Sequence, residues 1–117
     1  MGVPFYDNRL DGIGAGVVDV ERVYRFDWRR FGRPEWDELD RIYRRLPGAV
    51  QYLDVPFWFG SSDQSPPYLW ASVEPSGLQV CGFLAESDWV RWDHQFRAEA
   101  EGLPTLRPSD EARHGDA

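Results

Sequence analysis

Few residues in this 117-residue chain have the type and spacing that catalysis requires. The single cysteine, Cys81, lies in an apolar stretch, which favours a small buried side chain over a reactive thiol. His94 directly follows Asp93, and adjacent helix positions point about 100° apart, so this aspartate does not orient the imidazole as a general base. No Gly-x-Ser-x-Gly motif presents a serine nucleophile. The sequence therefore predicts no catalytic residue and no enzyme activity.

No cofactor or metal site is predicted either. All 13 basic residues are arginine, which excludes a Schiff-base lysine and the phosphate-binding lysine of a P-loop. One cysteine and two histidines do not form a cluster with zinc-ligand spacing. Gly12, Gly14 and Gly16 superficially resemble a dinucleotide fingerprint, but we expect no strand before them and no helix after them, so we interpret them as a loop.

Carboxylates are spread over several predicted elements, and two of them could in principle flank a bond as in glycoside hydrolases. A chain of this length has little room for a sugar cleft beside its core. We therefore rank an enzyme activity of this kind last among the hypotheses.

Aromatic rings and carboxylates share the segment 50–89, which contains no basic residue. Many of these rings are expected in the core of a small domain that has six tryptophans. Strand alternation, however, directs Tyr68, Trp70 and Glu74 to the face opposite their immediate neighbours. Rings flanked by carboxylates suit a partner protein with a basic surface. We predict a partner-binding site composed of Trp58, Asp63, Tyr68, Trp70 and Glu74.

The negative charge is concentrated in the C-terminal part of the chain. The formal net charge is −7, and residues 49–117 carry the whole excess of acids over arginines. Such a field favours a cationic partner and repels a phosphate backbone, so a nucleic-acid partner is not expected. A patch of arginines close in sequence is the one place where nucleic acid could bind. These are Arg22, Arg25, Arg29, Arg30 and Arg33.

Four strands and two helices are expected to position these residues. Alternating aromatic and charged residues predict a strand over 17–28, and an apolar stripe predicts a helix over 33–46. A second strand over 50–59 is placed at a sheet edge, because Pro56 has no N–H for a central ladder. Trp89, Trp92 and Phe96 form the stripe of a second helix, with Ser87 or Asp88 as its cap.

A hairpin is predicted over 68–84, around the turn Pro75-Ser76-Gly77. With Gly77 in a bulge, Glu74 lies opposite Leu78 and Trp70 lies opposite Gly82. This register places Cys81 on the buried face.

The order β-α-β-β-β-α predicts an α+β fold, with a small, mostly antiparallel sheet of about four strands and both helices on one face. We divide the chain into a flexible lead-in (1–16), a single domain (17–103) and a polar tail (104–117). No apolar run approaches the ~20 residues of a membrane span, and the first residues do not resemble a signal peptide. We therefore expect a cytoplasmic protein with no membrane partner.

The leading hypothesis is a small acidic binding protein that masks a cationic protein partner, as bacterial immunity proteins, antitoxins and phage-encoded inhibitors do. One alternative is a carbohydrate- or small-ligand-binding module that stacks its ligand on Trp58, Tyr68 and Trp70. Another is an accessory subunit of a larger enzyme. The sequence predicts no oligomeric state.

Overall fold

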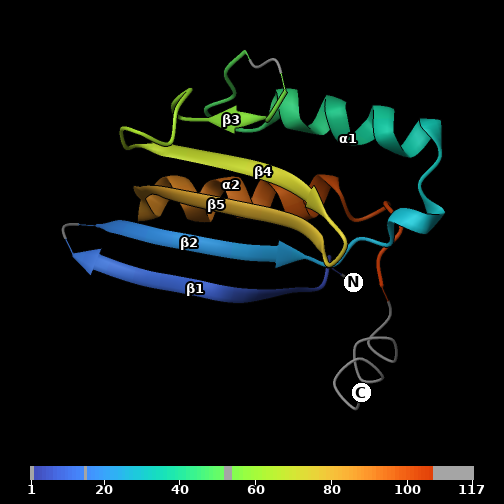
Figure 1. The fold of residues 1–117 in the computed structure, drawn as a ribbon, viewed down its shortest axis with the longest axis horizontal. Coiled ribbons are helices and arrows are strands. Elements are labelled where there is room, and N and C mark those ends of the chain that lie inside the picture. The colour runs from blue at the N-terminus through green and yellow to red at the C-terminus, as the bar shows by residue number, and fades with distance from the viewer. Residues whose placement is uncertain (1, 15, 52–53, 107–117) are drawn as a thin grey trace.

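A computed structural model describes residues 2–14, 16–51 and 54–106 and has an α+β fold. Five strands form one antiparallel sheet in the order β1-β2-β5-β4-β3 (Figure 1). The strands are β1 (Phe5–Gly14), β2 (Val17–Tyr24), β3 (Phe57–Trp58), β4 (Tyr68–Glu74) and β5 (Gly77–Ala85). The helices are α1 (Arg33–Arg45) and α2 (Glu86–Glu99), and the short 3-10 helix η1 (Trp28–Arg30) precedes α1. The predicted fold class is confirmed, with one strand more than expected.

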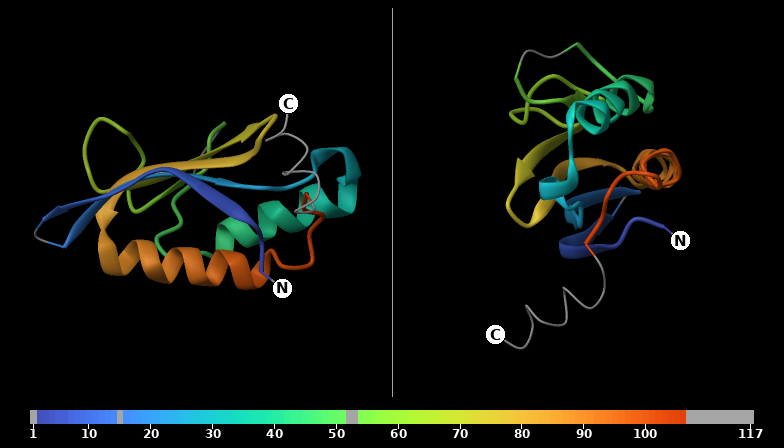
Figure 2. Two further views of the ribbon diagram at one scale, coloured as in Figure 1. Left: turned by 90° about the horizontal axis from the view of Figure 1, so that it is seen from below. Right: turned by 90° about the vertical axis from the view of Figure 1, so that its right-hand side faces the viewer.

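Both helices cover the same face of the sheet (Figure 2). Residues three and four positions apart meet on one side of a helix, so each helix buries one apolar stripe. Neither helix in the described residues has the length and apolar content needed to cross a membrane. The buried stripes contain Leu39, Ile42 and Tyr43 in α1, and Trp89, Trp92 and Phe96 in α2.

The helix α2 begins without an intervening loop after β5. The Glu86 N–H donates to the Gly16 carbonyl at 2.7 Å, so the turn between β1 and β2 satisfies one of the first helical donors. The predicted side-chain cap by Ser87 or Asp88 is wrong, because the helix begins before both residues.

Aromatic rings dominate the core between the sheet and the helices. Trp92 lies 5.0 Å from Trp58 and 5.1 Å from Phe96, measured between ring centroids. Tyr24 of β2 meets Phe96 edge to face at 4.8 Å. Edge-to-face and offset pairs of this kind stabilise a core beyond their area burial. The large aromatic cluster expected from six tryptophans is therefore present.

The N-terminal residues form a strand, and the prediction of a flexible lead-in over 1–16 is wrong for most of that range. Residues Phe5–Gly14 pair with β2 along its whole length. A bulge between Asp7 and Arg9 shifts the side-chain alternation by one residue, which obscures the period-two pattern in the sequence. Gly14 and Gly16 have φ of +90° and +73°, which the tight return into β2 requires.

The hairpin is present, but its predicted register is wrong by one residue. Glu74 pairs with Gly77 and Trp70 pairs with Cys81, so Pro75 and Ser76 alone form the turn. Gly77 has φ of +140°, and the Tyr24 carbonyl oxygen lies 2.2 Å from where a Cβ would be placed. The neighbouring strand therefore restricts this position more than the turn itself does.

The segment 50–59 contributes a strand of only two residues. β3 is the last strand of the sheet, so the predicted edge position is confirmed. Before it, the chain folds back on itself, since the Val50 N–H donates to the Phe57 carbonyl at 3.3 Å. Residues 52 and 53 lie outside the described residues.

The first residues of the predicted C-terminal tail are paired with the domain. The Asp27 N–H donates to the Pro104 carbonyl at 3.0 Å, and the Leu106 N–H donates to the Arg25 carbonyl at 2.9 Å. The ordered domain thus extends to Leu106, beyond the predicted limit at 103. The rest of the predicted tail, 107–117, lies outside the described residues.

A buried ionic network connects α2 to β1 and β2. Asp93 is 6 % exposed and accepts a hydrogen bond from Arg22 Nη1 at 2.8 Å and from the Tyr24 hydroxyl at 2.7 Å. Arg97, one turn along α2, donates to the same carboxylate at 2.8 Å. Arg22 also donates from Nε to Asp7 at 2.7 Å and stacks over a β1 ring. Asp93, which the sequence analysis treated as a neighbour of His94, therefore holds the helix on the sheet.

The free energy of unfolding at acid pH should depend on this network. Burial tends to raise the pKa of Asp93, but the hydrogen bonds from Arg97 and Tyr24 and the charge of Arg22 outweigh it, so the pKa is lowered. A carboxyl group with a lowered folded-state pKa stabilises the fold above its unfolded pKa of about 3.9. We expect the free energy of unfolding to decrease as the pH falls below about 4, measured by urea denaturation at several pH values.

The variant Asp93→Asn provides the control for this pH effect. Its stability deficit relative to the unsubstituted protein should shrink as the pH falls, because Asp93 is then protonated and, like the asparagine that replaces it, carries no charge. A deficit that stays constant down to pH ~2 would assign the acid dependence to other carboxyl groups.

Candidate functional site

The face of the sheet away from the helices is not covered by either helix, and we call it the helix-free face (Figure 2). Its half-buried side chains alternate with the core residues along β4 and β5. Four half-buried side chains on this face are aromatic, one on β3 and three on β4 and β5, and we call these the aromatic half: Phe57, Tyr68, Trp70 and Phe83. Strand register places these rings in two neighbouring rows, because Trp70 pairs with Phe57 and Tyr68 pairs with Phe83.

Carboxylates continue both rows on β2 and β1. Asp19 lies directly opposite the Phe83 ring on β5. Glu21 lies opposite Cys81, which in turn lies opposite Trp70, so Glu21 extends the row of Phe57 and Trp70. On β1, Arg9 contacts both acids, with its Nε 3.1 Å from Asp19 Oδ1 and its Nη1 3.7 Å from Glu21 Oε1. Asp11 pairs with Asp19 and adds a third carboxylate. We call Asp11, Asp19 and Glu21 the acidic half; together with Arg9 it has a net charge of −2.

The predicted site residues are only partly brought together. Tyr68 and Trp70 lie on the helix-free face as expected. Glu74 lies on the same face at the turn end of β4, where it accepts a hydrogen bond from the Ser72 hydroxyl. Asp63 is exposed in the connection between β3 and β4, which rises on the helix-free side of the sheet (Figure 2).

Trp58 is not a surface residue, and its place in the predicted site is corrected. Its side chain is 1 % exposed and lies on the core face, next to Trp92. The indole Nε1 donates to the Tyr43 carbonyl at 3.0 Å, so its polar atom is satisfied inside the protein. Because neighbours along a strand face opposite sides, Phe57 takes the surface position that was predicted for Trp58.

Cys81 lies on the helix-free face between Trp70 and Glu21, half-buried instead of in the core as predicted. Burial raises the pKa of its thiol to about 11, and the charge of Glu21 adds to this. A thiol with this pKa is almost fully protonated at neutral pH and is a poor nucleophile. Cys81 is therefore a half-buried thiol on the helix-free face and not the core side chain that was predicted.

The five arginines near the first predicted strand do not form one basic patch. Arg22 and Arg25 are 5 % and 8 % exposed, and Arg22 is paired with Asp7 and Asp93. Arg29 and Arg30 are exposed but both contact Asp27, at 3.3 Å and 3.1 Å. The charges of these four arginines are used within the domain, whereas Arg33 is exposed, so this part of the chain presents a smaller basic surface than the sequence predicted.

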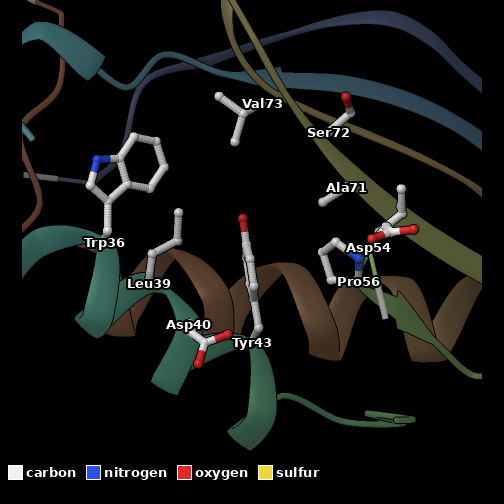
Figure 3. A pocket seen from close by; sticks show the side chains of 10 residues that line it. Trp36, Leu39, Asp40, Tyr43, Asp54, Pro56, Ala71, Ser72 and Val73 are labelled. Carbon is white, nitrogen blue, oxygen red and sulfur yellow. The ribbon is translucent and has the colours of Figure 1, made fainter. Parts of the chain in front are cut away.

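A groove lies beside the sheet edge, between α1 and β4, and we call it the edge groove (Figure 3). Its volume is about 420 Å³. Leu39 and Tyr43 of α1 form part of its floor, and Trp36 and Asp54 lie toward opposite ends (Figure 3). Trp36 is 39 % exposed and stacks on Trp28 at 5.1 Å. The groove is not visible in the sequence, because α1 and β4 are brought together only by the fold.

No group of three or more potential metal ligands occurs within residues 2–14, 16–51 and 54–106. Comparison with known proteins found no matching family model, no similar curated protein and no similar solved structure. The candidate site therefore rests on the residues of this chain alone.

The residues that sequence analysis missed come from distant parts of the chain. Asp19 and Glu21 were assigned to the first predicted strand, but the sequence does not show that β2 lies beside β5. The register error that placed Cys81 on the buried face also placed Phe83, two residues further along the same strand, on the wrong side. One signal was available: Asp19 and Glu21 alternate with Val18 and Val20, which is the pattern of a strand with one solvent-facing side.

Proposed function

We propose that this protein binds a partner protein through the helix-free face and masks a basic surface of that partner. The supporting observation is that the aromatic half and the acidic half lie side by side on one open sheet face. Half-buried rings offer area that a partner can desolvate, and carboxylates steer a positively charged surface toward them. The proposed role is that of a small cytoplasmic inhibitor or immunity-type protein.

The other candidate functions receive less support. A carbohydrate module would stack its ligand on three rings, but Trp58 is in the core and only Tyr68 and Trp70 remain accessible. Nucleic acid could stack on the same rings, yet Asp19 and Glu21 lie beside them and would repel phosphates. An accessory subunit of an enzyme would use the face in the same way, so it is a special case of protein binding.

Replacing Trp70 by alanine is expected to weaken partner binding by about 2 kcal/mol or more, because Trp70 lies in the middle of the aromatic half. The partner would first be isolated from the native host with the tagged protein, and then purified for calorimetric titration. The variant should remain folded, since its side chain lies outside the core. Trp58→Ala is unsuitable for this test, because its loss would open the core.

The matched control is Arg41→Ala, on the outer face of α1, where the guanidinium pairs with Glu38 of the same helix at 2.9 Å. We expect it to change binding by less than about 0.5 kcal/mol. The double variant Asp19→Asn, Glu21→Gln should slow association and reduce its dependence on salt. Unchanged affinity of a folded Trp70→Ala, or a captured partner with an acidic contact surface, would refute the proposed function.

A further inference from the structure

The ladder between β3 and β4 ends at a proline. Trp58 pairs with Leu69, and two residues further along β4 the Ala71 N–H donates to the Pro56 carbonyl at 3.3 Å. The return bond to the Ala71 carbonyl would need an N–H, which Pro56 does not have. From this point the chain before β3 bends away from β4, and the edge of β4 is left open.

Val73 presents the next pair of backbone groups at this edge. In an antiparallel strand, residues two positions apart direct their N–H and C=O to the same side, so Val73 continues the pattern of Leu69 and Ala71. Within the described part of the chain, no backbone hydrogen bond to Val73 is formed on this side. The Val73 side chain is 51 % exposed. One donor and one acceptor are therefore available to an added strand.

The edge groove lies directly beside these groups, and Val73 forms part of its wall (Figure 3). Its volume of about 420 Å³ falls in the range of ligand pockets, roughly 300–1,000 Å³. Leu39 and the ring of Tyr43 supply a largely apolar floor, with the Tyr43 hydroxyl pointing into the groove (Figure 3), and Val55 adds an exposed apolar rim at 40 % exposure. An alkyl chain would fit this floor.

The charged residues of the groove favour a positively charged ligand. Asp40 and Asp54 line it, and no arginine is among its described lining residues. Asp40 is paired with Arg44 at 3.0 Å, whereas no ion pair is formed between Asp54 and another described residue. A cation on an alkyl stem is complementary to an apolar floor that ends at an exposed carboxylate.

We propose that the edge groove binds an extended segment of a partner protein that carries an arginine. The backbone of the arginine residue pairs with the N–H and C=O of Val73, which adds a short strand to the sheet edge. Its side chain crosses Tyr43 and its guanidinium reaches Asp54. This site is separate from the helix-free face and does not depend on the function proposed for that face.

The opposite edge of the sheet does not offer an equivalent site. β1 carries Asp7, Arg9 and Asp11, and its bulge at Asn8 interrupts the ladder. Charged side chains and bulges are devices that prevent strand addition. β4 pairs with β5 without a bulge up to Glu74↔Gly77, so the backbone at Val73 keeps the regular geometry of a strand.

The probe for this site is the peptide acetyl-Thr-Val-Arg-Val-Thr-amide, titrated into ¹⁵N-labelled full-length protein. Amide signals of Ala71 and Val73 and the indole signal of Trp36 should shift. Replacing the arginine by uncharged citrulline should weaken binding about fivefold. Methylating the backbone nitrogen of the arginine should abolish binding, because this removes the donor to the Val73 carbonyl.

Two variants test whether the guanidinium of the peptide contacts Asp54. Asp54→Asn should bind the arginine and citrulline peptides equally, while Asp63→Asn, an exposed aspartate in another connection, should keep the fivefold difference. Equal binding of both peptides to the unsubstituted protein would overturn the proposal. So would shifts confined to Trp70, Cys81 and Phe83, or Val73 shifts that depend on protein concentration without peptide, which would assign the edge to a second copy. About fivefold weaker binding of the arginine peptide to Asp54→Asn, with normal partner binding through Trp70, would separate the two sites.

Discussion

Replacing Asp93 by alanine is expected to lower the free energy of unfolding by about 3–5 kcal/mol, which is typical when one member of a buried ionic network is removed. Arg22 would lose one of its two carboxylate partners while 5 % exposed, and the fully buried Tyr24 hydroxyl would lose its acceptor. An unpaired buried polar group loses its hydration without compensation. Urea denaturation at neutral pH measures the effect.

The control for this variant is Asp88→Ala on the same helix. Asp88 is more exposed and pairs with Arg91 on the surface of the helix at 3.4 Å, so its loss should cost about 1 kcal/mol or less. If the two variants are equally stable, the network contributes little net stability, and α2 is held on the sheet by its apolar stripe alone.

Replacing Gly77 by valine should destabilise the domain by about 3 kcal/mol or more. Part of this cost comes from φ of +140°, which a β-branched residue resists. The larger part comes from β2, because a Cβ would lie 2.2 Å from the Tyr24 carbonyl oxygen and 3.2 Å from Val23 Cγ1. The strand β2 would have to move away from the hairpin, which would be measured as a lower melting temperature.

Two further variants separate the causes. Gly77→Ala should be nearly as destabilising as Gly77→Val, since the contact involves the Cβ itself. Gly12→Val is the matched control, because no atom lies within 4 Å of the position of its Cβ and valine is favoured in strands. We expect it to change stability by less than about 0.5 kcal/mol. An unchanged melting temperature for Gly77→Val would contradict the close approach of β2 and the hairpin.

Local patterns in the sequence correctly predicted the two helices and the hairpin. The stripe of Leu39, Ile42 and Tyr43 needs only the helical period, and the Pro75-Ser76-Gly77 turn needs only residues that accept its backbone angles. Pro56 correctly predicted an edge strand, because a missing N–H excludes a central position wherever the other strands lie. Each of these features is decided by residues that are close together in the sequence.

Predictions failed where a partner from a distant part of the chain decides the outcome. β1 was missed because its bulge at Asn8 breaks the alternation, and the strand is held by pairing with β2. The hairpin register depends on the contact between Gly77 and Tyr24. These two residues are 53 positions apart in the sequence, so the residues of the turn do not reveal the contact. The acidic half joins the aromatic half only because β2 lies beside β5.

The sequence by itself determined that rings and carboxylates would share the segment 50–89 and that some rings would be accessible. Only the tertiary structure decided which ones. Trp58 and Trp70 have similar local surroundings in the sequence, but the pairing of β3 with β4 puts Trp58 on the core face and Trp70 on the helix-free face. The side of a sheet that becomes core is set by the helices that cover it, and α1 and α2 both lie on the side of Trp58.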